Sequence, residues 1–432
     1  MRMKGLKVKI GVFVAVLFMV AGAQRLAAKE PASIVFLTWK PNQPEVWDSL
    51  IEQFHQENPD IRVKVQVGPH SSTEYHAVVT QRLKNKDASV DVFFIDVIWP
   101  PEFASAGWAL NLTSRFSKKE QKAFLPATIS ANTYHGNIYG VPCFTDAGLL
   151  YYRKDLLDKY GFDPPRSWTE MLSQGQVIVQ GEHDPTLNIY SGQFKQYEGL
   201  VCDMLEFIWS HGGEVIDPLD HSVLLAQPAS VEAVRFVRDR IIGRAAPRGA
   251  VNYEEPESLE VFIQGRAIFL RSWPYAWALA NDPEKSRVAK KIGVGVLPAF
   301  KGHAPVSTLG GWQFAISRWS QHPDEAWAFV KFMTSYESQA RLALEAGLAP
   351  TRIKVYDDPR VKEDMPHLKS FLPAFEAARP RPSSPLYPMI SAELQRFFSR
   401  AIAGTQTDIQ SLAEAASARI KRIIQMEAAT EQ

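Results

Sequence analysis

The run from Val90 to Trp99 restricts the possible folds more than any other part of the chain. It is short, rich in β-branched and aromatic residues, and closed by Pro100-Pro101, which is typical of a strand buried on both faces of a parallel sheet. In open α/β sheets, ligands bind beyond the carboxyl ends of such strands. Asp96 and Trp99 are therefore candidates for holding a polar, ring-shaped ligand, although a helix-capping Asp and a core Trp explain the same residues.

The preceding residues predict two more strands separated by helices. Ser33–Trp39 is a short apolar strand, Glu45–Phe54 has the apolar spacing of a helix, and Ile61–Val67 alternates between apolar and polar residues. Ser71 to Glu74 has a capping-box pattern that opens a second helix. Together with the strand at Val90, these segments form a β-α-β-α-β unit, the start of a doubly wound α/β sheet.

The length of the chain predicts two lobes. Roughly 400 residues follow the first 28, which is more than one hydrophobic core usually supports. Turn residues at Gly136–Pro142, before a strand that begins near Asp146, indicate a crossing into a second lobe, and the strand at Ile292–Pro298 leads back. We expect residues 29–142 with 296–335 in an N-terminal lobe and residues 143–295 with 336–432 in a C-terminal lobe.

The first 28 residues have the pattern of a secretory signal peptide. Basic residues between Arg2 and Lys9 precede the apolar run Ile10–Ala23, which is too short to span a bilayer comfortably and is followed by small-residue cleavage options. No cysteine lies near these options. The sequence therefore predicts an exported, freely diffusing periplasmic protein without a lipid anchor.

Charge and cysteine content indicate neither a nucleic-acid partner nor a disulfide scaffold. The 48 Lys and Arg nearly balance the 47 Asp and Glu, and five of the basic residues precede Lys29, so the exported chain is slightly acidic. The two cysteines, Cys143 and Cys202, lie far apart in the sequence. We expect them to be buried thiols, with one disulfide as the less favoured alternative.

The sequence lacks the usual catalytic and metal-binding signatures. It contains no GxSxG, HExxH, paired CxxC or GxxxxGK[ST] motif, and its ten histidines show no ligand spacing. We therefore predict no catalytic residue, no metal ion and no cofactor.

Carboxylates and aromatic rings recur instead near the ends of predicted strands, at Trp39, Asp96, Trp99, Asp146, Trp273, Tyr275 and Trp312. Sugars need this combination, because their hydroxyl groups bind carboxylates and their C–H faces pack on flat rings. The pattern predicts a sugar-binding site. A glycoside hydrolase with Asp96 and Asp146 as acid and base is the alternative. Trp47, Trp209 and Trp327 lie inside predicted helices and should pack in the core.

Six stretches spread over the chain carry a resemblance to a known family. They are Asp91–Trp99, Asp146–Leu157, Lys195–Asp203, Trp273–Trp277, Leu309–Trp312 and Pro380–Pro382. Together they resemble the extracellular solute-binding proteins of ABC sugar importers, most closely the trehalose- and maltose-binding branch. The resemblance implies a two-lobed periplasmic-binding-protein fold, type II-like, in which each lobe is an α/β sheet flanked by helices and the ligand lies between the lobes.

The resemblance also implies roles for individual residues. Hydrogen bonds to sugar hydroxyls would come from Glu45, Asp96, Asp146 and Arg381, stacking or packing surfaces from Trp273, Tyr275 and Trp312, and a close backbone approach from Gly311. The implied ligand is a disaccharide such as trehalose or maltose. The implied partner is an ABC permease in the membrane, and we expect the protein to be a monomer.

The sequence departs from the family pattern at three places. Phe144 stands where relatives tend to carry a tyrosine, Leu348–Pro350 replaces a tryptophan-bearing loop, and His76-Ala77 occupies a helix start where an arginine is expected. These departures leave the identity of the sugar open. A periplasmic sensory or structural module, and a binding protein for another small polar solute, are further alternatives.

Overall fold

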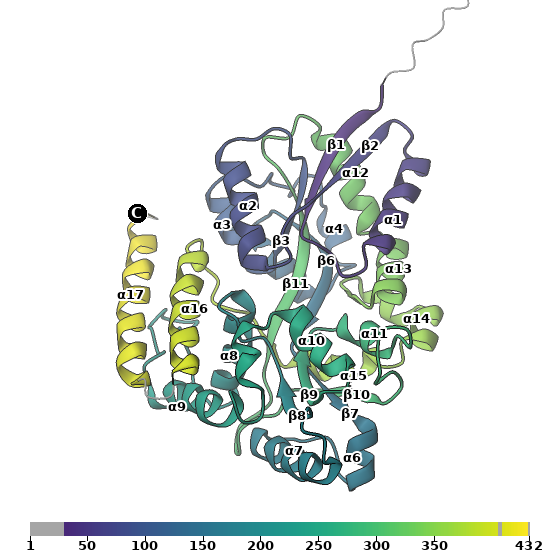
Figure 1. Ribbon diagram of the computed structural model, residues 1–432. Coiled ribbons are helices and arrows are strands. Elements are labelled where there is room, and N and C mark those ends of the chain that lie inside the picture. Colours follow the sequence, from purple (N-terminus) through teal and green to yellow (C-terminus); the bar gives the residue numbers. More distant parts are fainter. Residues whose placement is uncertain (1–29, 405–407, 431–432) are drawn as a thin grey trace, which may run out of the picture.

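The computed structural model describes residues 30–404 and 408–430. The predicted signal peptide over residues 1–28 lies outside these ranges. Within them the chain forms two lobes, one above the other in Figure 1, and strands run from one lobe into the other. No helix in this part of the chain combines the length and apolar character needed to cross a membrane.

The first lobe is built on a mixed seven-stranded sheet with the order β12-β6-β11-β3-β1-β2 and with β13 beside β11. The strands are β1 (Ala32–Thr38), β2 (Ile61–Val67), β3 (Val92–Asp96), β6 (Val141–Ala147), β11 (Ser307–Ile316), β12 (Ala349–Pro350) and β13 (Ala378–Arg379). β1 is parallel to β2 and β3, whereas β11 is antiparallel to β3 and β6. The prediction that β3 lies in a parallel sheet was therefore right on its β1 side and wrong on its β11 side.

Helices cover both faces of this sheet, as expected from β3, whose residues are all buried. On one face, Phe36 of β1 packs against Phe329. On the other face, Phe93 of β3 packs against Phe103. The covering helices are α1 (Pro44–Glu57), α2 (Ser72–Lys84), α3 (Pro100–Ser105) and α12 (Pro323–Met333) (Figure 1).

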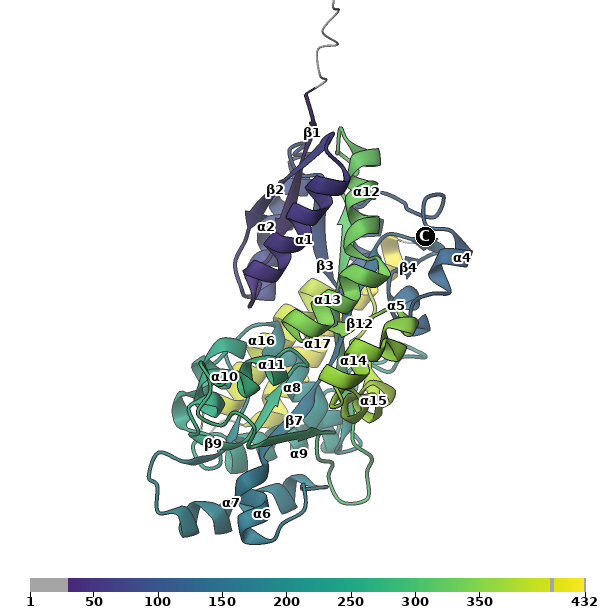
Figure 2. The same ribbon diagram turned by 90° about the vertical axis from the view of Figure 1, so that its right-hand side faces the viewer.

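The second lobe contains a four-stranded sheet with the order β10-β7-β9-β8. Its strands are β7 (Leu149–Arg153), β8 (Asn188–Ser191), β9 (Ala267–Ser272) and β10 (Ile292–Gly295). The helices of this lobe include α6 (Lys154–Tyr160), α7 (Trp168–Glu182), α8 (Glu198–Trp209), α9 (Pro228–Phe236), α10 (Glu255–Ile263), α11 (Ala276–Asn281), α16 (Tyr387–Ala403) and α17 (Ile409–Thr430). Figure 2 shows α6 and α7 at the end of the molecule furthest from β1.

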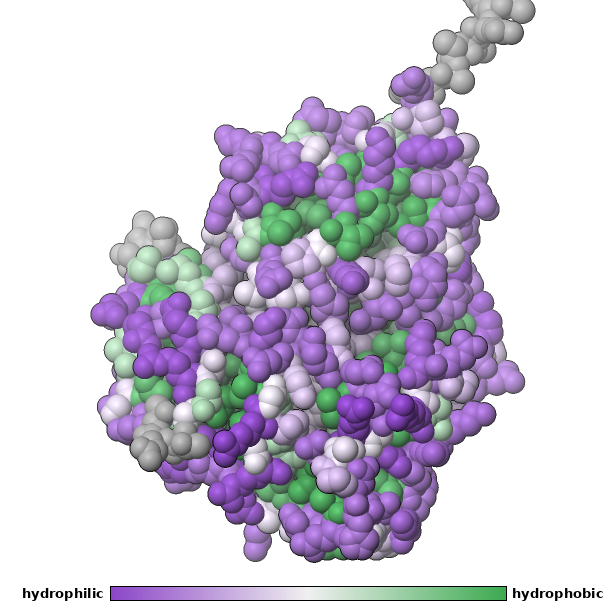
Figure 3. Space-filling model, viewed as in Figure 1, coloured by the Kyte–Doolittle hydropathy of each residue, from purple (hydrophilic) through white to green (hydrophobic). Residues whose placement is uncertain are grey.

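Short elements complete the described chain. They are α4 (Lys118–Gln121), α5 (Pro126–Ala131), β4 (Thr133–Tyr134), β5 (Asn137–Ile138), a π-helix (Val237–Ile241), two 3₁₀ helices (Arg248–Asn252 and Ile353–Asp357), α13 (Tyr336–Ala346), α14 (Pro359–Asp364) and α15 (Leu368–Glu376). At the edge of the first sheet, Val65 and Val67 are 38% and 59% exposed. Figure 3 shows apolar side chains gathered on this lobe.

Strands β6 and β11 run between the lobes, and their contact requires a glycine. β6 continues through Gly148 into β7, and the Ser307 hydroxyl of β11 donates a hydrogen bond of 2.7 Å to the Gly148 carbonyl. Gly311 of β11 has a φ of +124°, and a Cβ there would lie 2.6 Å from the carbonyl oxygen of Phe144. A side chain would push the strands apart, so only glycine fits.

The lobe boundaries at residues 142/143 and 295/296 stay a prediction.

The cysteines and the helical tryptophans occupy interior positions. Cys143 and Cys202 are free and buried, so the expected buried thiols are confirmed and the alternative disulfide is wrong. Trp47 and Trp209 are buried in the two lobes, and Trp327 packs against the first core while half-buried. These three tryptophans are core residues, as predicted.

Candidate ligand-binding cleft

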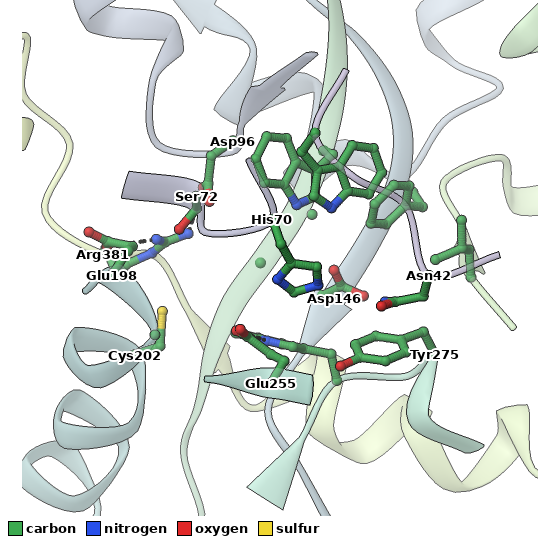
Figure 4. Close-up of a pocket in the computed structure, with 18 residues that line it drawn as sticks. Asn42, His70, Ser72, Asp96, Asp146, Glu198, Cys202, Glu255, Tyr275 and Arg381 are labelled. Carbon is green, nitrogen blue, oxygen red and sulfur yellow. Dashed lines mark hydrogen bonds and ion pairs between the residues drawn. The ribbon is translucent and has the colours of Figure 1, made fainter. Parts of the chain in front are cut away.

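A cavity of about 100 Å³ lies where β6 and β11 cross between the lobes (Figure 4). Its lining comes from both lobes and from the crossing strands. The residues are Trp39, Asn42, His70, Ser72, Asp96, Phe144, Asp146, Glu198, Gly199, Cys202, Glu255, Trp273, Tyr275, Gly310, Gly311, Trp312, Leu348 and Arg381. Aromatic rings and carboxylates dominate, which is the combination that the strand ends predicted.

The aromatic wall of the cavity consists of Trp39, Phe144 and Trp312. The two indoles stack with their ring centroids 5.1 Å apart and an angle of 7° between the ring planes. Phe144 packs against Trp39 at 6.0 Å, and Phe94 meets the same indole edge-on at 4.9 Å. Because neighbouring rings hold each indole, the wall is ordered before any ligand arrives and offers apolar surface to C–H groups.

A buried arginine joins two carboxylates at one end of the cavity. Arg381 donates to Asp96 at 2.7 Å and to Glu198 at 2.8 Å, and it is 2% exposed. Burial raises the pKa of Asp96 although the positive charge of Arg381 opposes this rise. Tyr387 and Ser391 donate to the same Glu198 carboxylate. Since both terminal nitrogens of Arg381 are engaged, only its Nε lacks a partner among the described residues.

Asp146 lies near the end of β6, and its surroundings differ from those of Asp96. It is 7% exposed, and its Oδ1 has no hydrogen-bond partner among the described residues. Burial, together with the negative charge of Asp96, raises the pKa of Asp146 to about 7. The Asp146 carboxyl group can therefore accept a hydrogen bond from a polar group inside the cavity, or donate one to it.

The charged wall of the cavity belongs to the second lobe and is formed by Glu255 and Trp273 over Arg271. The Arg271 guanidinium lies 3.8 Å from the centroid of the Trp273 ring, and the indole Nε1 donates to Glu255 at 3.2 Å. Tyr197 donates to the same carboxylate at 2.8 Å. These contacts fix the indole plane from one side, so its orientation depends on charges rather than on other rings.

Behind this wall, Arg271 is fully buried and shared between two acids. It donates to Glu206 through Nε at 2.8 Å and through Nη2 at 2.7 Å, and its Nε lies 3.1 Å from Asp203. The Thr308 backbone amide of β11 donates to Glu206 at 3.0 Å. This network therefore ties the Trp273 support to the strand that crosses between the lobes.

Most of the predicted site residues meet at the cavity. Asp96, Asp146, Trp273, Tyr275, Gly311, Trp312 and Arg381 all line it. Glu45 does not line it and is exposed in the first turn of α1, so its role stays a prediction. Trp99 is 4% exposed and stacks on Phe103, so the core alternative holds for this tryptophan.

Several lining residues were not singled out by the sequence. Asn42 and His70 follow β1 and β2, where the strand-end rule that selected Asp96 applies equally. Glu198 and Glu255 are the first residues of α8 and α10, where acidic side chains are common because of the helix dipole. Because a position at a helix start already explains these two glutamates, the sequence did not indicate that they also line the cavity.

The two lobes touch across the cavity. The Thr73 hydroxyl of α2 accepts a hydrogen bond of 3.1 Å from the Glu198 amide of α8.

One group of residues could in principle ligate a metal ion. His70, Glu254 and Glu255 bring possible metal-ligating atoms within 4.8 Å of one another. Both carboxylates already have partners, since Lys195 donates to Glu254 and two donors bind Glu255, so this geometry does not call for a metal ion.

Comparison with known proteins places these features in a family. The profile described as bacterial extracellular solute-binding protein matches residues 40–340. A probable ABC transporter-binding protein of Deinococcus radiodurans is 39% identical over 74% of this chain and 76% of its own length. The structure of maltose-bound MalE3 of T. maritima is 38% identical, has a TM-score of 0.86, and covers 91% of this chain and 100% of its own.

A more distant structure shares the fold alone. The solute-binding protein of Agrobacterium radiobacter in complex with ribitol is 21% identical, with a TM-score of 0.83 over 91% of this chain and 99% of its own. The two lobes, the cavity between them and these matches agree. The chain belongs to the bacterial extracellular solute-binding protein family.

Proposed function

We propose that this protein captures a disaccharide of the maltose or trehalose type between its lobes in the periplasm and delivers it to a membrane permease. The observation that carries the proposal is the pairing of an ordered aromatic wall with carboxylates inside one cavity. Rings suit the C–H faces of pyranoses and carboxylates suit their hydroxyl groups. The maltose-bound relative at 38% identity supports this size and class of ligand.

In the proposed mechanism, ligand binding favours the closed arrangement of the lobes. A ligand that contacts Trp312 from one side and Trp273 from the other gains both sets of contacts only when the lobes are together. The proposed lobes are residues 29–142 with 296–335 and residues 143–295 with 336–432. A micromolar dissociation constant corresponds to about −8 kcal/mol, which a few charge-assisted hydrogen bonds and stacked rings can supply after ordering costs.

The alternative of a glycoside hydrolase finds less support. A general base must be free to accept a proton, whereas Asp96 is bound to Arg381 at 2.7 Å and also accepts the Ile98 amide. Incubation with α-linked disaccharides and an assay for new reducing ends separates the two functions. Catalytic release of reducing sugar would favour the hydrolase.

Tryptophan fluorescence offers a direct test, because stacked indoles line the cavity. The full protein is titrated with maltose, trehalose, sucrose, ribitol and mannitol, and each dissociation constant is confirmed by calorimetry. We expect saturable binding of maltose or trehalose in the micromolar range or tighter. Binding of only the polyols, or of none of these compounds, would contradict the proposed ligand class.

A further inference from the structure

Asp146 differs from the other acids that line the cavity. Asp96 and Glu198 bind Arg381, and Glu255 accepts two hydrogen bonds. The Oδ1 of Asp146 has no such partner among the described residues, although the side chain is 7% exposed. A buried carboxylate without a partner is unfavourable. The geometry therefore leaves this oxygen to a ligand.

The two arginines near the cavity, Arg381 and Arg271, already pair with carboxylates other than Asp146. Arg381 donates to Asp96 and Glu198 through its two terminal nitrogens. Arg271 donates to Glu206 through Nε and Nη2 and to Gln193 through Nη1, and its Nε lies 3.1 Å from Asp203. The lining itself contains four acidic residues and one arginine. Negative charge is thus in excess around Asp146, and low-dielectric walls strengthen its effect on anything that enters.

We propose that Asp146 selects the ligand by charge, so that the cavity binds a saccharide carrying a protonated amino group beside this carboxylate more tightly than the neutral parent sugar. The corresponding acidic sugar is rejected. The inference rests on the proposed function, since it assumes that the cavity holds a saccharide. An ammonium group supplies the missing donor and the missing positive charge together, and charge-assisted hydrogen bonds are roughly twice as strong as neutral ones.

Burial and the negative charge of Asp96 raise the pKa of Asp146 to about 7 although the positive charge of Arg271 opposes this rise, which agrees with the assignment. A bound ammonium group would favour the ionised form. A neutral hydroxyl would do so less strongly, and a carboxylate or phosphate on the ligand would repel it.

The test compares matched sugars on the full protein at pH 7. Calorimetry measures maltose and trehalose, their derivatives with one amino group in place of a hydroxyl at C2, C3, C4 or C6 of one ring, and the derivatives oxidised to a carboxylate at C6. We expect at least one amino derivative to bind about tenfold more tightly than its parent. Each carboxylate derivative should bind at least about tenfold more weakly than its parent.

In the variant Asp146→Asn, the amino derivative should bind no more tightly than its parent sugar, and both affinities are measured. Asp364→Asn, at an exposed position at the end of α14, is the matched control and should keep it. If no amino derivative improves on its parent in the wild-type protein, or if the gain survives in Asp146→Asn, the inference is wrong while the proposed function stands. If no saccharide binds at all, both are wrong. The wild-type series decides the matter even if the Asn variant does not fold.

Discussion

The aromatic wall and the charged wall of the cleft reach the same order by different physics. Trp39 and Trp312 are held by ring contacts, which need no partner charge and do not change with pH. Trp273 is held by Arg271, whose guanidinium is itself held by Glu206. Removing one ring should therefore weaken the aromatic wall locally. Removing one charge should instead leave other charges of the charged wall buried and uncompensated.

The largest effect is expected from the variant Arg381→Met. It would leave Asp96 and Glu198 buried without their cation, and breaking a buried ion pair costs about 3–5 kcal/mol. Urea unfolding measures this loss of stability. Arg379→Ala is the control, since Arg379 is 41% exposed and its pair with Glu214 should contribute much less. Equal losses in the two variants would show that the buried pair has no special weight.

A smaller effect is expected from Trp312→Ala. Trp312 is half-buried, so we expect a loss of roughly 2–3 kcal/mol in stability together with a large loss of sugar affinity. Trp277→Ala is a matched control, because Trp277 is also half-buried and stacks on His367 at 4.4 Å, but it does not line the cavity. Unfolding and calorimetry should show stability loss in both variants and affinity loss only in Trp312→Ala.

The affinity for a neutral sugar should rise with pH through Asp146. In the free protein the pKa of Asp146 is raised to about 7 by burial. A hydroxyl that donates to the carboxylate stabilises the ionised form, so the pKa falls on binding and binding releases a proton. Affinity then increases as pH rises from the bound pKa toward 7 and levels off above it, by up to about tenfold per pH unit. Calorimetry between pH 5 and 8 measures this, and a flat profile, or one unchanged in Asp146→Asn, would contradict it.

The smallest effect is expected at the two cysteines, one of which lies beside the aromatic wall and the other elsewhere in the cavity lining. Cys143 lies in β6 beside Phe144 of the aromatic wall, and Cys202 lies in α8 at the cavity. Burial raises the pKa of both thiols well above the usual value, so the reactive thiolate is rare. Native protein should resist iodoacetamide at both positions, as mass spectrometry would reveal. Selective labelling of Cys202 would mean that the cleft opens beside α8.

The sequence predicted the elements better than their arrangement. The strand Ile61–Val67 is present as β2 with the same bounds, because its alternation of apolar and polar residues has clear ends. The antiparallel direction of β11 beside β3 was not predictable, since composition does not encode strand direction. Likewise, nothing local indicates that Arg381 binds Asp96 across 285 residues. The resemblance implied both as ligand contacts, but only the fold pairs them with each other.

The position of β11 has a consequence for how the chain becomes complete during synthesis. β11 lies between β3 and β6 in the first sheet, yet it is made more than 150 residues after β6. Until it emerges, the edges of β3 and β6 have no neighbour there, and Asp96 waits still longer for its counter-ion. The amino-terminal third therefore cannot complete its own interior, because translation must pass residue 381 before Asp96 gains the arginine that pairs with it.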